Sequence, residues 1–253
     1  MENFAQGIKR FTSRHPYFLF LILGTFHRDT CRRLKKLIRK HDLILDIGAL
    51  DSPYSIYFSN QVVAVDLPSE GRFGFSMEIL RELKLRRNVS AMIASTESLP
   101  FKAKSFDRIV CTEVLEHVYH DRSAVCELAR VLKVDGKSFL TTPNQKGIPL
   151  QYGIKEHVRH YSENGLNDLL SEFFGEVVIE KRFRLWCFLR ASTTFWNRWI
   201  KNRYNVFFFL GSLLCSWMYD LVYLLEKLGQ SNDSEYNLLA VCSESIESPC
   251  MHV

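Results

Sequence analysis

Short apolar runs rich in β-branched residues alternate with helical patterns through the middle of the chain, and this alternation constrains the fold more than any other feature. The runs lie at 43–47, 62–65, 91–93, 108–111 and 138–141. Segments with helical spacing of apolar residues separate several of them, at 76–86 and 122–132. Alternating strands and helices build a parallel sheet with helices on both faces. The sequence therefore predicts a doubly wound α/β domain.

Three further elements are expected after the fifth run. Residues 162–174 carry leucines on one helical face, and Ser162 is placed to cap that helix, with Gly165 in its first turn. An apolar run at 177–181 predicts a sixth strand, and another at 238–241 predicts a last strand.

Positive charge is concentrated at the start of the chain. Residues 1–41 hold ten Lys or Arg against two acids, although the whole chain of 253 residues carries only +5. Between Asp29 and Lys40 the apolar positions recur at helical spacing, which predicts an amphipathic helix with a basic face. Such a face suits an anionic surface, either lipid headgroups or nucleic acid, but it is also typical of a solvated helix.

The cysteines and the N-terminal segment favour a cytoplasmic location. The seven cysteines are odd in number and show no C-x-x-C pair, which is typical of free thiols in a reducing compartment. The apolar stretch at 17–26 lacks a small-residue cleavage site and is too short to span a bilayer, so we expect no signal peptide.

Acidic residues stand at the ends of the first two predicted strands. The first strand runs through Asp46 into Gly48, where a glycine lets a ligand approach the backbone. The second ends at Asp66, and a carboxylate in that place can accept hydrogen bonds from both hydroxyls of a ribose. An acidic residue at a strand end is also a common turn former, so these two features alone leave a nucleotide site and a plain turn equally open.

The stretch 95–118 favours the nucleotide site, because it contains Leu99-Pro-Phe, Ser105-Phe-Asp and Leu115-Glu-His-Val in order. It resembles the signature of the class I S-adenosylmethionine-dependent methyltransferases, in their small-molecule type 11 branch. Val131-Leu-Lys-Val-Asp-Gly136 is similar to that family's loop before the fifth strand, and the resemblance covers about residues 40–182. It implies a Rossmann-like seven-stranded, mostly parallel sheet with an antiparallel last strand, and S-adenosyl-L-methionine as cofactor.

The resemblance also implies roles for individual residues. The amino-acid end of the cofactor would lie at Asp46, Gly48 and Ala49, and its ribose at Asp66 and Leu67. The positions implied beside the adenine and the sulfonium are Ser95, Thr96, Glu97, Thr112 and Glu113. The positions implied at the rim of the acceptor pocket are His157, His160 and Tyr161.

Two departures from the family pattern support an alternative. The chain has Leu50 and Ser52 where further glycines are usual, and Ser95 where an adenine-binding Asp is usual. These changes favour a catalytically inactive scaffold or binding protein of the same fold, whereas Asp46, Gly48, Asp66 and the intact motifs favour an enzyme. A nicotinamide-dependent dehydrogenase fits the glycine loop less well and leaves the later motifs unexplained.

His117 follows the fourth strand, where an acceptor would sit, and an imidazole has a pKa suited to a general base at neutral pH. A packing or capping role for His117 is equally open. Residues of metal-ligand type also gather in this part of the sequence: Glu113, Glu116, His117, His120, His157 and His160. Their spacings match no specific metal site, so we expect no metal.

Residues 183–229 form a basic and aromatic insertion before the last strand, between a core at 42–182 and a tail at 230–253. Three interpretations compete: a helical cover over the acceptor pocket, a contact with the membrane interface, and a spanning helix. We reject the third, because Asp220 would lie in hydrocarbon and the last strand could not reach the sheet. No recognised nucleic-acid-binding module accompanies the insertion. The interfacial interpretation predicts a peripheral membrane protein with a lipid-like or lipid-linked acceptor; otherwise the acceptor is small or lipid-like.

Overall fold

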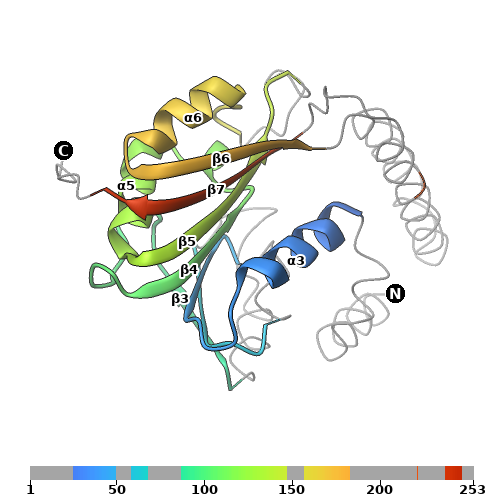
Figure 1. Ribbon diagram of the computed structural model, residues 1–253. Helices are drawn as coiled ribbons and strands as arrows, with labels where there is room; N and C mark the ends of the chain where they lie inside the picture. The colour runs from blue at the N-terminus through green and yellow to red at the C-terminus, as the bar shows by residue number, and fades with distance from the viewer. Residues whose placement is uncertain are drawn as a thin grey trace, which may run out of the picture.

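One seven-stranded sheet forms the centre of the molecule (Figure 1). The computed structural model describes residues 25–49, 58–67, 87–146, 157–182, 221 and 237–246. The strands are β1 (Ile44–Ile47), β2 (Val62–Asp66), β3 (Val89–Ile93), β4 (Phe106–Thr112), β5 (Leu132–Pro143), β6 (Phe174–Arg182) and β7 (Asn237–Ser245). Their spatial order is β3-β2-β1-β4-β5-β7-β6. The predicted fold class is therefore confirmed for the sheet.

Strand direction explains where a ligand can bind. The pairs β3-β2, β2-β1, β1-β4 and β4-β5 are parallel, whereas β7 runs antiparallel between β5 and β6. The chain passes from β1 to β2 on one side and returns to place β4 on the other side of β1. In open α/β sheets such a reversal leaves a crevice beyond the carboxyl ends of the strands. The carboxyl edge at β1 and β4 is the place to search for a site.

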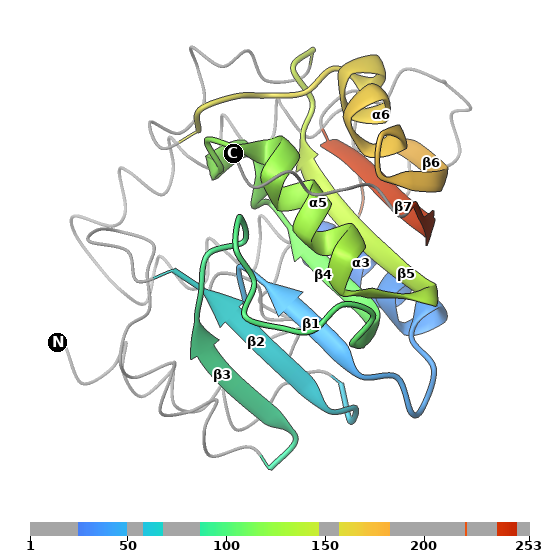
Figure 2. The ribbon, with the colours of Figure 1, turned by 90° about the vertical axis from the view of Figure 1, so that its left-hand side faces the viewer.

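Helices cover both faces of the sheet (Figure 2). The helix α3 (Thr25–Leu37) packs on one face, and α5 (Asp121–Val131) and α6 (Glu163–Ser171) pack on the other. Successive side chains of β1 point to opposite faces of the sheet. Ile44 therefore packs with α3, whereas Leu45 and Ile47 pack with the layer of α5 and α6. All three side chains are buried, as expected for a central parallel strand.

The helix α5 lies within one residue of the predicted 122–132 at both ends, whereas α6 ends three residues before the predicted 174 and α3 lies three to four residues before the predicted 29–40. The predicted cap of α6 is confirmed, because the Ser162 hydroxyl accepts a hydrogen bond of 3.0 Å from the Gly165 N–H. The fifth strand is longer than predicted, and 132–136, expected to be a loop before that strand, lies inside β5. These residues are nevertheless irregular, because the pairing of β4 with β5 shifts register between Leu132 and Lys137.

The helix α3 is amphipathic as predicted and is fixed to the far edge of the sheet by charged contacts. Its Asp29 accepts a hydrogen bond from the Arg182 guanidinium of β6, and both side chains are buried. Arg33 bridges the same carboxylate and Glu180, at 2.9 and 2.6 Å. The basic side chains on its outer face are exposed, Arg32, Lys35 and Lys36 among them.

The cysteine prediction holds only in part. Cys31, Cys111 and Cys242 are free and buried, and burial raises the pKa of the Cys31 thiol to about 12. Cys126 is disulfide-bonded, which corrects the expectation of free thiols at that position. Sequence spacing could not reveal this bond, because it depends on how the fold places the sulfur atoms.

The predicted helix at 76–86, Leu50, Ser52 and nearly all of the predicted insertion at 183–229 lie outside the described residues. The proposed domain boundaries stay predictions. Within the ranges that are described, no helix is both long and apolar enough to cross a membrane.

Candidate functional site

The turn after β1 requires glycine at position 48 for two reasons. Gly48 has φ +69°, in the left-handed region that side chains disfavour, and a Cβ atom there would lie 2.5 Å from Cγ2 of Val114. Its N–H donates to the Val65 carbonyl at 2.9 Å, which ties the turn to β2. The loop after β4 therefore packs directly against the turn after β1.

Asp46 lies beneath this turn rather than on its surface. Its side chain is fully buried in β1, on the same face of the strand as Ile44 and thus toward α3. After burial, which is the largest cause, the negative charge of Asp46 helps to raise the pKa of Cys31, against the opposite effect of Lys35. Ala49, the next predicted contact, is buried as well.

Asp66 ends β2 beside this turn. Its carboxylate accepts a hydrogen bond of 2.8 Å from the Leu67 N–H, and its carbonyl accepts one of 3.1 Å from Ala94, just after β3. Asp66 is half-buried and Leu67 is exposed, so the carboxyl ends of β1 and β2 present a backbone turn and a carboxylate side by side. This arrangement fits the ribose and amino-acid ends of a nucleoside ligand.

The segment that the resemblance places beside adenine is a tight turn. The Ser95 hydroxyl accepts from the Glu97 N–H at 3.2 Å, and the Ser98 N–H donates to the Ser95 carbonyl at 3.2 Å. Glu97 accepts from the backbone N–H of His120, the residue that precedes α5. These contacts hold the turn against the helix that follows β4, with Thr96 buried inside it.

Glu113, just after β4, adopts an unusual backbone conformation that its neighbours hold in place. Its φ is +55°, which is rare for a residue with a side chain. Its carboxylate accepts hydrogen bonds of 2.9 Å from Thr141 and 2.8 Å from Asn237. Backbone conformations of this kind cluster at functional sites, where the surrounding structure enforces them. Thr112, the preceding predicted contact, is buried at the strand end.

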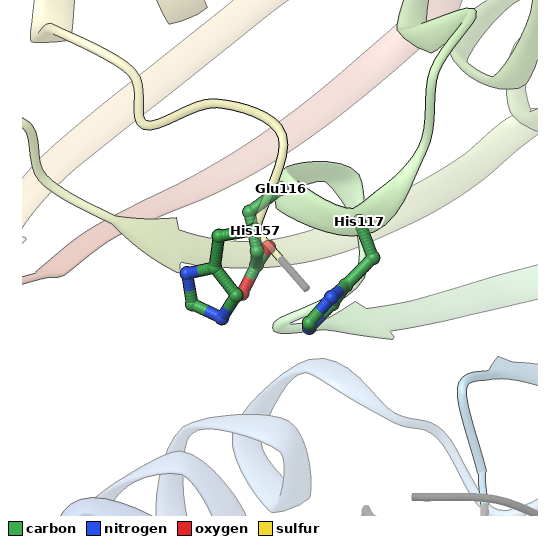
Figure 3. A group of neighbouring side chains, drawn as sticks. All are labelled: Glu116, His117 and His157. Atoms are coloured by element: carbon green, nitrogen blue, oxygen red, sulfur yellow. The ribbon is translucent and has the colours of Figure 1, made fainter. Parts of the chain in front are cut away.

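Glu116, His117 and His157 converge from two loops (Figure 3). Each offers one ligand-type atom, and these atoms all lie within 4.8 Å of one another. The rings of His117 and His157 are perpendicular, with centroids 4.6 Å apart, and His157 Nδ1 lies 2.7 Å from Nε2 of His160. The structure therefore brings together three histidines that are up to 43 positions apart in the sequence.

Glu116 belongs to the short 3₁₀ helix η2 (Leu115–His117) and is fully buried. Burial, and secondarily the negative charge of Glu113, raise the pKa of Glu116 well above its ordinary value. Thr142 donates to Oε2 at 3.2 Å, and Oε1 has no hydrogen-bond partner among the residues that the structure describes. A buried carboxylate oxygen left in this way usually indicates a function or an unseen ligand. From the sequence, Glu116 is recognisable only as a residue of metal-ligand type, and its position inside the apolar run Val114–Val118 is the signal for its burial.

Tyr161, predicted at the rim of the acceptor pocket, is buried, and its hydroxyl donates to Asp121 at 2.8 Å. Its phenol is thus part of the contact between α5 and the loop before α6. His120 directly precedes α5 and does not belong to the group of converging side chains. The ligand-binding roles of the other predicted site residues remain predictions.

Residues 45–140 match the protein family described as "Methyltransferase domain". This range contains the turn after β1, Asp66, the adenine-side turn and the loop after β4. It covers the part of the chain on which the sequence resemblance was based, apart from the segments after the fifth strand.

Related proteins agree with this match. The chain is 28% identical over 160 residues to the uncharacterised methyltransferase YcgJ of Bacillus subtilis, covering 58% of this chain and 61% of that protein. It is 34% identical over 106 residues to a ubiquinone biosynthesis O-methyltransferase of Xanthomonas oryzae, covering 40% and 43%. The matches to two uncharacterised Methanocaldococcus jannaschii proteins span 49% and 41% of those proteins, so the chain spans about half the length of its curated relatives.

Solved structures show the same fold. The crystal structure of YcgJ aligns with a TM-score of 0.53 and 20% identity, over 86% of this chain and 99% of that one. A Haemonchus contortus phosphoethanolamine N-methyltransferase in complex with S-adenosyl-L-methionine aligns with a TM-score of 0.56 and 16% identity, over 83% and 51%.

Proposed function

Given that the α/β domain of this chain belongs to the class I S-adenosylmethionine-dependent methyltransferases, we propose that it binds S-adenosyl-L-methionine and methylates a small or amphiphilic acceptor. The observation that carries the proposal is the pairing of the Gly48 turn with the Asp66 carboxylate at the reversal point of the sheet. The positive φ of Gly48 and the closeness of Val114 exclude a side chain from this turn, and a turn without a side chain lets a ligand approach its backbone closely.

The bound cofactor supplies a methyl carbon that an adjacent sulfonium makes electrophilic. The protein then has to hold the cofactor, orient an acceptor and exclude water. In this proposal the turn at Gly48 and Ala49 binds the amino-acid end, and Asp66 accepts hydrogen bonds from the ribose hydroxyls. The turn containing Ser95 and Glu97 lies along the adenine.

The cofactor proposal is tested by titrating the purified chain with S-adenosylmethionine and its demethylated product. We expect Asp66→Ala to weaken binding by about 100-fold, because two hydrogen bonds to a carboxylate contribute roughly 1.5 kcal/mol each. The matched control is Asp135→Ala, at an exposed carboxylate in β5. No binding to the unchanged protein at millimolar ligand would reject the proposal and favour the inactive scaffold.

His117 is the proposed general base for a hydroxyl or carbon acid acceptor. It is exposed in the loop after β4, at the same edge of the sheet as the Gly48 turn, so its imidazole can take a proton from a bound acceptor atom. Acceptors that are already nucleophilic would not need it. Full turnover by His117→Ala with the cofactor bound would exclude this role.

An anionic membrane surface is the proposed partner, with a lipid-like or lipid-linked acceptor. The exposed basic face of α3 supports this proposal, since Lys and Arg near a lipid surface each contribute about 1 kcal/mol. We expect the chain to float with vesicles containing anionic lipid at low salt and to be released as salt rises. Vesicles of neutral lipid are the control. Failure to float in low salt would contradict the membrane proposal and leave the cofactor proposal intact.

A further inference from the structure

The side chains of Glu116, His117 and His157 have the composition of a metal site. Two imidazoles and one carboxylate form a donor set that binds zinc in enzymes and leaves a coordination position open for water or substrate. Ligand atoms on a tetrahedral ion with bonds near 2.0 Å lie roughly 3.3 Å apart. The atoms here lie within 4.8 Å of one another, so an ion would draw them together by side-chain rotation. His117 is exposed, so the movement of its ring does not require repacking of the core.

The hydrogen bonds around the cluster leave suitable atoms facing its centre. Oε1 of Glu116 is buried and finds no hydrogen-bond partner within the described part of the chain, while Oε2 accepts a hydrogen bond from Thr142. His157 Nδ1 is engaged with His160, and Nε2 is on the side of the ring that faces Glu116 and His117 in Figure 3. Histidine ligands usually donate their second N–H to an outer partner, which fixes the tautomer and the ring orientation. His160 is such a partner when Nδ1 of His157 carries the proton.

The two loops that carry these ligands are fastened to each other. The Val158 N–H donates to the Glu116 carbonyl at 2.8 Å, and Arg159 pairs with Asp121 at 2.5 Å. The Gln145 N–H donates to the Tyr161 carbonyl at 2.9 Å. A site that spans two loops needs such fixed backbones, because ordering them on binding would reduce the affinity.

We propose that Glu116, His117 and His157 bind one divalent transition-metal ion, best matched by zinc, with His160 supporting His157. The site lies at the carboxyl edge of β4, two residues beyond Val114, which packs on the Gly48 turn. It therefore adjoins the region assigned to the cofactor.

An ion at this position determines the class of acceptor. Its open coordination position takes an oxygen ligand, so the acceptor is a hydroxylated compound whose oxygen the ion orients and polarises. This role toward an acceptor rests on the proposed function, whereas binding of the ion does not. An ion and a proton use the same lone pair of His117, so His117 acts as a ligand in the metal-loaded protein and as a base only without the ion.

The test uses the full chain without an affinity tag, stripped with a chelator and titrated with Zn²⁺ and, for its visible d–d absorption, with Co²⁺. We expect one tightly bound equivalent, a d–d spectrum without a thiolate charge-transfer band, and a higher Tm with the ion. His157→Ala should weaken binding at least about 100-fold, and His160→Ala about 10- to 100-fold. The matched control is His120→Ala, which removes a nearby exposed imidazole outside the cluster and should bind like the unchanged chain.

Glu116→Gln keeps the shape of the side chain and an acceptor for Thr142, so this variant should still fold. It therefore tests the metal site even if an alanine variant does not fold. Equal affinity in the unchanged chain, His157→Ala and Glu116→Gln would overturn the proposal, as would the lack of a saturable equivalent in the folded protein. S-adenosylmethionine binding, measured on the same samples, separates the two proposals. Cofactor binding without metal binding rejects only the metal site, and metal binding without cofactor binding rejects only the methyltransferase function.

Discussion

Replacing Asp29 by Ala is expected to destabilise the chain by about 3 to 5 kcal/mol, because it leaves the buried guanidinium of Arg182 without that carboxylate. The two side chains are only 8% and 4% exposed, so solvent cannot take the place of the lost partner. The pair joins α3 to β6, which is the edge strand beside β7 in the sheet. Urea unfolding followed by far-UV circular dichroism measures the loss of free energy of unfolding.

The neighbouring exposed pair gives a matched control. Glu180→Ala removes a carboxylate that also contacts α3 through Arg33, but these side chains are 49% and 35% exposed. Exposed ion pairs contribute about 0 to 1 kcal/mol, so this variant should lose little stability. Replacing both buried partners, Asp29→Leu with Arg182→Met, should recover part of the loss because no unpaired charge remains. Equal losses in Asp29→Ala and Glu180→Ala would show that burial is not what makes the pair important.

Most of the fold could be predicted from local patterns. Central parallel strands are buried on both faces and read as apolar runs, which located β1, β2 and β4 within one or two residues. The cap of α6 was predictable because the Ser162 hydroxyl satisfies an N–H in the first turn of its own helix. The start of β5 was not predictable, since its register shift depends on pairing with β4 rather than on its own residues.

The residues of the candidate site that stand at strand ends could be predicted from the sequence. Those that are brought together by tertiary contacts could not. Gly48 and Asp66 stand at such ends, and the topology brings the carboxyl ends of β1 and β2 to one edge of the sheet. Glu116 and His157 are 41 positions apart, and only hydrogen bonds such as Val158 to the Glu116 carbonyl bring them together. This explains why the ligand-type residues matched no known metal spacing and nevertheless form a compact group.

Gly48→Ala is expected to lower the free energy of unfolding by about 2 to 5 kcal/mol. A left-handed backbone costs an alanine roughly 1 to 2 kcal/mol, and overpacking of a close contact adds roughly 1 to 3. The contact is severe, because the new Cβ would lie 2.5 Å from Cγ2 of Val114, a β-branched side chain with little rotational freedom. Urea unfolding measures the loss, with Gly165→Ala as the control. Of the described residues, a Cβ at Gly165 meets only the Ser162 hydroxyl, at 3.1 Å, so its effect should stay within about 0.5 kcal/mol.

A second substitution separates the two causes of the Gly48 effect. Val114→Ala removes the atom that the new Cβ would approach, so the double variant should recover the contact energy but keep the backbone cost. We expect a coupling energy of about 1 to 2 kcal/mol between the two positions. A coupling near zero would mean that the turn after β1 and the loop after β4 do not press on each other. In that case the proposed cofactor turn and the Glu116 loop would not be energetically linked. A clear coupling would mean that a ligand bound at one of these loops affects the energy of the other loop.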